Sequence, residues 1–105
     1  MAEDDKLYEA IEVARATGKI KKGGNEVTKS VEKGEAKLVV VAKDVTPPEV
    51  IMHIPLLSKE KSVPCFEVPS KEELGAAAGL SVSTAAVAIV QEGEAKNIIK
   101  GFVKE

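Results

Sequence analysis

The chain has 105 residues, enough for one domain spanning 1–105 with a single modest core. Hydrophobic residues make up 44% of it and aromatic residues only 3%, so the core must be aliphatic, and the composition argues against disorder. The net charge of −2 lacks the basic excess that most nucleic-acid-binding domains carry, so only a local basic patch could serve that purpose.

Cysteine content and hydropathy limit where the protein can work. Cys65 is the only cysteine, which excludes an intramolecular disulfide and a cysteine-based zinc cluster. The sequence shows no signal-like segment and no apolar run of the ~18 residues that a membrane span needs. We therefore expect a soluble, cytoplasmic protein with no membrane partner.

Helical and strand-like patterns alternate along the chain. The first helix is the clearest, with Leu7, Ala10, Ile11 and Ala14 at helical spacing and Gly18 after it. The expected helices cover residues 4–17, 25–34, 46–61, 71–78 and 92–103. The expected strands cover residues 19–22, 36–42, 63–68 and 85–90.

The second helix and the strand after it have distinct local signals. Asn25 is the expected N-cap of this helix, because its side chain can accept a hydrogen bond from the first turn. The helix would then bury Val27 and Val31. Residues 36–42 form a continuous run rich in valine, which predicts a strand buried on both faces of a sheet.

Capping residues and prolines mark the third and fourth helices. Thr46 is the expected cap of the third helix, and Pro55 should bend or interrupt it. Ser70 is the expected cap of the fourth helix, where Glu73 completes a capping box. The whole alternation predicts an α/β fold, a three-layer α/β/α sandwich with a four-stranded mixed sheet.

The sequence offers little material for catalysis. His53 is the only histidine, which leaves no histidine-based metal site and no Ser-His-Asp arrangement, and a structural or surface role is expected for it. Cys65 lies in an apolar strand, as an inert core thiol does. Gly18 and Gly23 have the separation of a P-loop, but the Lys-Ser/Thr that should follow is absent. We expect no enzyme, no cofactor and no metal site.

The segment "KKGGNEVTKS", residues 21–30, mixes glycines, lysines and a carboxylate. Residues 19–34 hold five lysines against two glutamates, a local charge of +3 in an acidic chain. On a helix beginning at Asn25, the side chains of Glu26, Lys29 and Lys33 would form one exposed stripe. Such a stripe can be an ordinary solvated face whose Glu-Lys pair is worth about 0.3 kcal/mol.

A functional interpretation accounts for more of the segment. The free N–H groups of a helix start and the nearby lysines attract phosphates, whereas the carboxylate of Glu26 repels them. Glu26 is useful if the ligand offers hydrogen-bond donors, as a guanine edge does, and the amide of Asn25 also suits a base edge. Glycines before the helix allow RNA to approach the backbone closely.

These residues resemble a known family. From about Leu7 to Val90 the chain is similar to the archaeal L-seven-Ae ribosomal proteins, and it carries the signatures "KKGGNEVTK", "AKDVTPPEVIMHIPLL", "VPSKEELG" and "AAGL" in the expected order. The resemblance implies a non-enzymatic kink-turn RNA-binding protein with an α/β/α sandwich fold. It also implies roles in the large ribosomal subunit, in box C/D and H/ACA guide ribonucleoproteins and in ribonuclease P.

The resemblance further implies which residues meet RNA and with what partners. Gly24, Asn25, Glu26 and Lys29 match positions that meet the tandem sheared G·A pairs, and the loop 80–83 matches a region that packs on bulge nucleotides. Together, pattern and resemblance imply RNA contacts by Lys22, Gly23, Gly24, Asn25, Glu26, Lys29, Lys33, Lys71, Leu80, Ser81, Val82 and Ser83. The implied partners are kink-turn RNA, from ribosomal, guide or ribonuclease P RNA, and other ribonucleoprotein core proteins, with the chain monomeric on RNA.

Three alternatives remain open at this stage. A related large-subunit protein of the thirty-e type would act in the ribosome alone. A small α/β ligand-binding protein would hold an anionic molecule at the helix start near Asn25. A protein-interaction module would have no RNA affinity.

Overall fold

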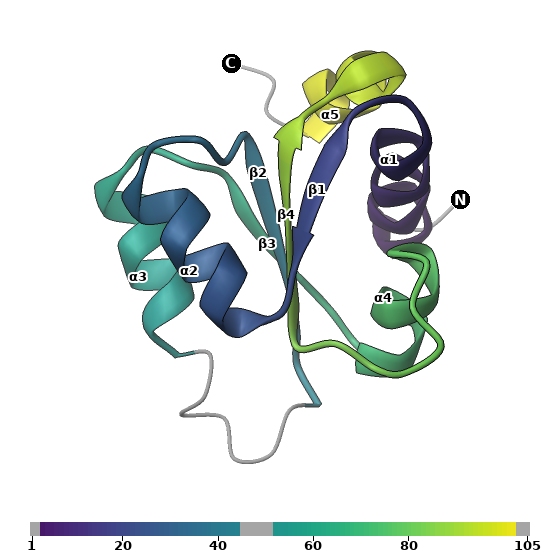
Figure 1. Ribbon diagram of the computed structural model, residues 1–105, viewed down its shortest axis with the longest axis horizontal. Coiled ribbons are helices and arrows are strands. Elements are labelled where there is room, and N and C mark those ends of the chain that lie inside the picture. The colour runs from purple at the N-terminus through teal and green to yellow at the C-terminus, as the bar shows by residue number, and fades with distance from the viewer. Residues whose placement is uncertain (1–2, 45–51, 103–105) are drawn as a thin grey trace.

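The computed structural model describes residues 3–44 and 52–102. Its α-helices are α1 Glu3–Thr17, α2 Gly24–Glu32, α3 His53–Glu60, α4 Lys71–Ala77 and α5 Lys96–Phe102, and a short 3-10 helix, η2 Gly93–Ala95, leads into α5. Its strands are β1 Lys19–Lys22, β2 Leu38–Ala42, β3 Cys65–Val68 and β4 Ala86–Gln91. The predicted alternation is confirmed, and the last predicted helix is divided into η2 and α5 (Figure 1).

The four strands form one mixed sheet in the order β1-β4-β2-β3. β4 pairs antiparallel with both β1 and β2, whereas β2 pairs parallel with β3. Every residue of β2 is buried, as the continuous apolar run predicted for a central strand. β1 lies at one edge of the sheet, and three of its four residues are exposed lysines.

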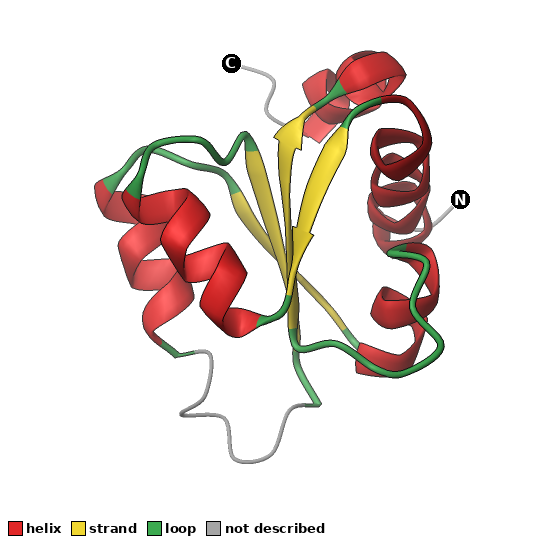
Figure 2. Cartoon of the chain, viewed as in Figure 1, coloured by secondary structure: helices red, strands yellow, loops and turns green. Residues whose placement is uncertain are grey.

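Helices cover both faces of the sheet, which confirms the three-layer sandwich. Figure 2 shows α2 and α3 on one side of the strands and α1, α4 and α5 on the other. Val27, Val31 and Ile54 pack with sheet residues on the α2 and α3 side. On the opposite side Leu7 and Ile11 belong to a second core. Each fully buried side chain of this size stabilises the fold by roughly 1.5–3 kcal/mol.

The start of α2 differs from the prediction. Gly23, not Asn25, is the N-cap, with φ 93° and ψ 150°, and no side chain caps the helix. This backbone conformation is accessible essentially to glycine alone, and it lets β1 turn directly into α2 with no connecting loop. The N–H of Gly23 still donates to the carbonyl of Ala86, 2.9 Å away, so the pairing with β4 extends to the turn. Asn25 is therefore already inside the first helical turn.

The third and fourth helices test the predicted caps and the predicted effect of Pro55. Thr46, the predicted cap of the third helix, lies outside the described residues. Pro55 does not interrupt α3, because it sits in the first turn, where a backbone N–H would have no helical partner. The predicted cap of α4 is confirmed, since the Ser70 hydroxyl accepts a hydrogen bond from the N–H of Glu73 at 3.1 Å.

Candidate nucleic-acid interface

Most of the residues implied in RNA contact lie at one end of the sheet. There β1 ends at Lys22 and turns into α2, β3 leads to α4 at Lys71, and the loop of residues 80–83 leads toward β4. These three junctions are at the lower edge of the molecule in Figure 1. Segments separated by about fifty residues in the sequence therefore contribute to the same end of the fold.

Hydrogen bonds of backbone and side-chain groups hold these junctions together. The N–H of Lys71 donates to the carboxylate of Asp44 at 2.9 Å, which ties the start of α4 to the residues after β2. The carbonyl of Lys71 accepts from the N–H of Thr84 at 3.2 Å, and the buried hydroxyl of Thr84 donates to the carbonyl of Ala86 at 3.2 Å. The carbonyl of Ala86 also accepts from the N–H of Gly23, so hydrogen bonds connect the starts of α2 and α4 to the beginning of β4.

The first turn of α2 presents hydrogen-bonding groups of both kinds. The N–H groups of the first helical residues have no partner four residues back, and no side chain caps them, so this end carries partial positive charge. The side chains of Asn25 and Glu26 are exposed. A ligand at this turn therefore meets backbone donors, an amide and a carboxylate within a single helical turn.

The exposed stripe on α2 is present as predicted. Glu26, Lys29 and Lys33 are exposed, and Val27 and Val31 are fully buried on the opposite side of the helix. The three charged side chains line a shallow hollow of about 110 Å³ together with Lys21, Ser30 and Glu35. The carboxylate of Glu26 therefore sits in a mainly basic setting.

Lys33 is placed differently from the other residues of the stripe. It is the C-cap of α2, about 12 Å along the helix from Asn25, at about 1.5 Å per residue. A cation at a helix C-terminus interacts favourably with the helix dipole whether or not a ligand is present. Lys33 thus lines the same hollow as Glu26 and Lys29, but from the opposite end of α2.

A side-chain relay from α3 reaches the first turn of α2. Thr28 donates its hydroxyl proton to the carbonyl of Gly24 at 2.7 Å, and the same oxygen lies 2.8 Å from Nε2 of His53. This contact could not be predicted from the sequence, because Thr28 and His53 are on different helices. It gives the only histidine of the chain a place beside the candidate interface.

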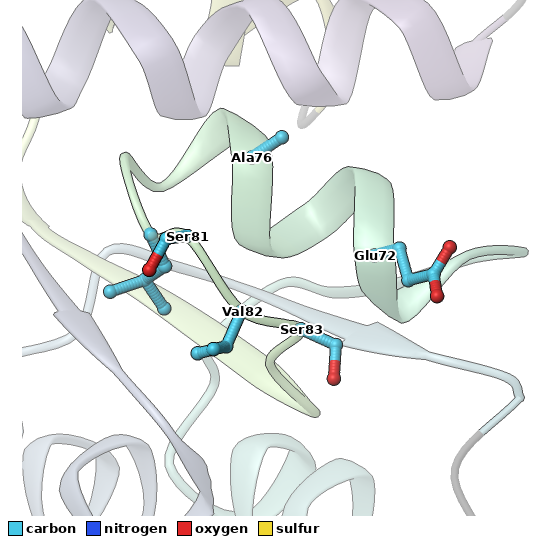
Figure 3. A pocket seen from close by; sticks show the side chains of 6 residues that line it. Glu72, Ala76, Ser81, Val82 and Ser83 are labelled. Carbon is cyan, nitrogen blue, oxygen red and sulfur yellow. The ribbon is translucent and has the colours of Figure 1, made fainter.

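The loop 80–83 lies directly on α4. Leu80, Ser81, Val82 and Ser83 line a hollow of about 420 Å³ with two residues of α4, Glu72 and Ala76 (Figure 3). The side chain of Val82 is 67% exposed. This hollow presents small, apolar and hydroxyl groups with one carboxylate, which suits a base more than a phosphate.

Gly75 explains how the loop comes so close to α4. A Cβ at this position would lie 2.2 Å from the carbonyl oxygen of Val82, inside the contact distance of real atoms. The helix therefore needs a residue without a side chain where the loop crosses it. Sequence reasoning missed Gly75, as it missed Asp44 and Thr84, although a glycine inside a short helix is itself a signal of close approach.

Comparison with known proteins identifies the family. Residues 5–99 match the family described as ribosomal protein L7Ae/L30e/S12e/Gadd45. The chain belongs to this family. A solved structure, the Giardia lamblia 15.5kD RNA binding protein, superposes with a TM-score of 0.90 at 33% sequence identity, covering 98% of this chain and 87% of that one.

Membership of the L7Ae/L30e/S12e/Gadd45 family confirms the resemblance drawn from the sequence motifs. Both matches are to proteins described by ribosomal or RNA association and not by a reaction, in agreement with the prediction of a non-enzymatic protein. Within the described residues, no cluster of three or more histidine, cysteine or carboxylate side chains could hold a metal ion. No helix among those residues combines the length and the apolar character of a membrane span.

The chemistry of Cys65 fits a non-catalytic protein. The side chain is partly buried in β3, and this burial raises the pKa of its thiol above the ordinary value. A raised pKa lowers the fraction of thiolate at neutral pH, and the thiolate is the nucleophilic form. Cys65 packs against the core residues on the α2 and α3 side of the sheet.

Proposed function

We propose that this protein binds kink-turn RNA and stabilises its bent form during assembly of the large ribosomal subunit and of box C/D and H/ACA guide ribonucleoproteins. The observation that carries the proposal is the first turn of α2, where uncapped backbone donors lie beside exposed Asn25 and Glu26. The family and the RNA-binding description of the matched Giardia protein support it.

The chemistry of this turn fits tandem sheared G·A pairs. A guanine exposes N1–H and N2–H₂ donors, which the carboxylate of Glu26 can accept, and Asn25 can donate to and accept from a neighbouring base edge. Lys29 lies one turn further along the same exposed face and can reach a phosphate beside the bases. Gly23 and Gly24 have no atom within 4 Å of an added Cβ, so a base could approach the backbone there.

The loop 80–83 would complete the interface by covering bulged nucleotides. The exposed isopropyl group of Val82 offers an apolar contact for an unstacked base, and Ser81 and Ser83 can hydrogen-bond to sugars or base edges. Such contacts discriminate little between nucleotide sequences. Lys22 and Lys71, at the ends of the same junctions, would contact the RNA backbone.

Stabilising a bent RNA requires different affinities for its two shapes. An RNA that interconverts between extended and bent forms is shifted toward the bent form only as far as the protein binds that form better. In this role the protein would act in the cytoplasm, as a monomer on RNA and alongside other ribonucleoprotein core proteins. Ribonuclease P RNA would be a further RNA partner.

A binding comparison tests the proposal. Gel shifts would use a kink-turn RNA and a matched RNA whose two G·A pairs are replaced by Watson–Crick pairs. We expect the first RNA to bind at least about thirtyfold more tightly at the same salt concentration, since two base recognitions are lost and each costs about 1–3 kcal/mol. Equal affinity for the two RNAs would refute recognition of the G·A pairs.

A further inference from the structure

A second basic hollow lies at the far end of β1 from the turn into α2. Three lysines line it, Lys19 and Lys21 of β1 and Lys37 just before β2, together with Glu35, Val90 and Gln91. Its volume is about 390 Å³, larger than the hollow beside Glu26. None of the contacts implied by the family resemblance falls on Lys19, Lys21 or Lys37.

The charges of this hollow are not balanced within the protein. All three lysines are exposed, and none of them forms an ion pair with another residue in the ranges 3–44 and 52–102. Glu35 is the one carboxylate among its lining residues, so the lining carries a formal charge of +2, from three lysines and one glutamate. Gathering like charges at one place is unfavourable unless an anion is present to screen them.

Protection of a sheet edge accounts for only part of this arrangement. β1 is an edge strand, and lysines on edge strands discourage pairing with another chain. Lys37 precedes β2, however, which is a central strand. Its backbone is fixed by a hydrogen bond from its N–H to the carbonyl of Ile89 at 2.6 Å, so its position beside the β1 lysines is built into the sheet.

The hollow is continuous with the stripe on α2. Lys21 and Glu35 line both hollows, so the basic surface runs from Lys29 and Lys33 across Lys21 to Lys19 and Lys37. Along β1 alone, the distance from Lys22 back to Lys19 is about 10 Å, at about 3.4 Å per residue. Double-stranded DNA carries a phosphate charge about every 1.7 Å of its axis, and at a similar charge density an RNA duplex along this track would present several phosphates.

We propose that the Lys19–Lys21–Lys37 hollow binds backbone phosphates of one duplex arm of the same RNA whose G·A pairs lie at the start of α2. This inference rests on the proposed function, because the α2 turn sets where the RNA enters. In this proposal the hollow contacts phosphates and makes no contacts with bases. It adds affinity that depends on salt and on the length of that one arm.

The test combines a protein change with an RNA change. The variant Lys19→Gln/Lys37→Gln leaves Lys21, which is shared with the α2 hollow, in place. The control Lys6→Gln/Lys100→Gln removes the same charge from exposed positions on α1 and α5, which cover the other face of the sheet. Affinities for kink-turn RNAs with both arms long, or with either arm shortened, would be measured between 50 and 200 mM salt.

Affinity falls with salt, so a plot of the logarithm of the association constant against the logarithm of the salt concentration has a negative slope. For Lys19→Gln/Lys37→Gln on the long-armed RNA, we expect this slope to become less steep by about 1 per lysine. The wild-type advantage over this variant should then shrink about 16-fold across the fourfold salt range. Shortening one particular arm should abolish the difference, shortening the other should not, and Lys19→Arg/Lys37→Arg should behave as wild type. The control variant should change the slope much less.

The outcomes separate the two proposals. A slope change that is equal in the control variant, or that persists whichever arm is shortened, would show only general electrostatic attraction and would overturn the inference. An unchanged slope on every RNA would also overturn it, and would leave the hollow to a protein or small anionic partner. Equal affinity of the wild-type protein for the G·A RNA and the Watson–Crick RNA would instead refute the proposed function.

Discussion

Thr28 and His53 connect two helices through one hydroxyl group. The Thr28 hydroxyl has a single proton, which it donates to the carbonyl of Gly24, so it can only accept from Nε2 of His53. The relay joins α3 to the turn of α2 that we propose reads the RNA, and it gives the histidine the structural role expected from the sequence.

Thr28→Val should therefore weaken both the fold and RNA binding. Valine has the shape of threonine but neither donates nor accepts, so the bonds to Gly24 and His53 are lost at a cost of about 1 kcal/mol in the free energy of unfolding. Urea denaturation would measure it. Thr28→Ser keeps the hydroxyl and should be close to wild type. A Thr28→Val protein with wild-type stability and RNA affinity would mean that the relay contributes nothing in solution.

Glu26→Ala should have opposite effects on specific and non-specific RNA binding. Loss of an acceptor for guanine donors should weaken kink-turn binding by about 1–3 kcal/mol. Removal of a negative charge beside Lys29 and Lys33 should at the same time strengthen binding to an RNA without G·A pairs, because phosphates are then repelled less. Glu32→Ala, which removes an exposed carboxylate from the same helix, is the control and should lack the first effect. If kink-turn affinity rises in Glu26→Ala, Glu26 is only a repulsive surface charge.

Gly75→Ala should displace the loop that covers α4. The added methyl group cannot coexist with the Val82 carbonyl 2.2 Å away, and the adjustment should cost about 1–3 kcal/mol of folding stability. RNA affinity should fall further than stability alone explains, because Val82 and Ser83 move. Gly101→Ala is the matched control, since its added Cβ meets nothing within 4 Å and alanine favours the helix. Thermal denaturation and gel shifts would measure the stability and the RNA affinity of both variants. Equal stability and equal affinity of Gly75→Ala and Gly101→Ala would contradict the close contact between Gly75 and Val82.

The two neighbouring glycines before α2 should respond oppositely to alanine. Gly23→Ala forces a side chain into a conformation with φ 93° and should cost about 1–3 kcal/mol. Gly24→Ala lies within the helix with open space around the new Cβ, and should stabilise the protein by about 0.4–1 kcal/mol. Denaturation midpoints of the two variants measure both effects. Similar shifts for the two would show that Gly23 is not the turning point.

The elements that follow from local pattern could be predicted from the sequence. The stripe that includes Leu7 and Ile11, the continuous run of β2 and the cap at Ser70 each depend on residues close in the chain, and all are present. The prediction that Asn25 caps α2 is wrong. Asn is a favoured capping residue in general, but the direct turn from β1 into α2 requires a glycine, Gly23, at the cap.

The contacts that build the candidate interface could not be predicted in the same way. Asp44 meets Lys71 across 27 residues of sequence, and the pair Thr28 and His53 is separated by 25. Such pairs depend on how helices and strands pack, which no local spacing reveals. The RNA contacts themselves remain predictions, grounded in the exposed first turn of α2 and in the family.

The hydrogen bonds among Gly23, Lys71, Thr84 and Ala86 have a consequence for the thermodynamics of binding. Because main-chain groups already fix both helix starts and the residues after the 80–83 loop, this surface is preorganised before any RNA arrives. In the proposed function, the loss of conformational entropy on association would then fall mostly on the RNA, which would have to give up its extended states. The protein would act as a rigid template that fixes the shape of a flexible RNA.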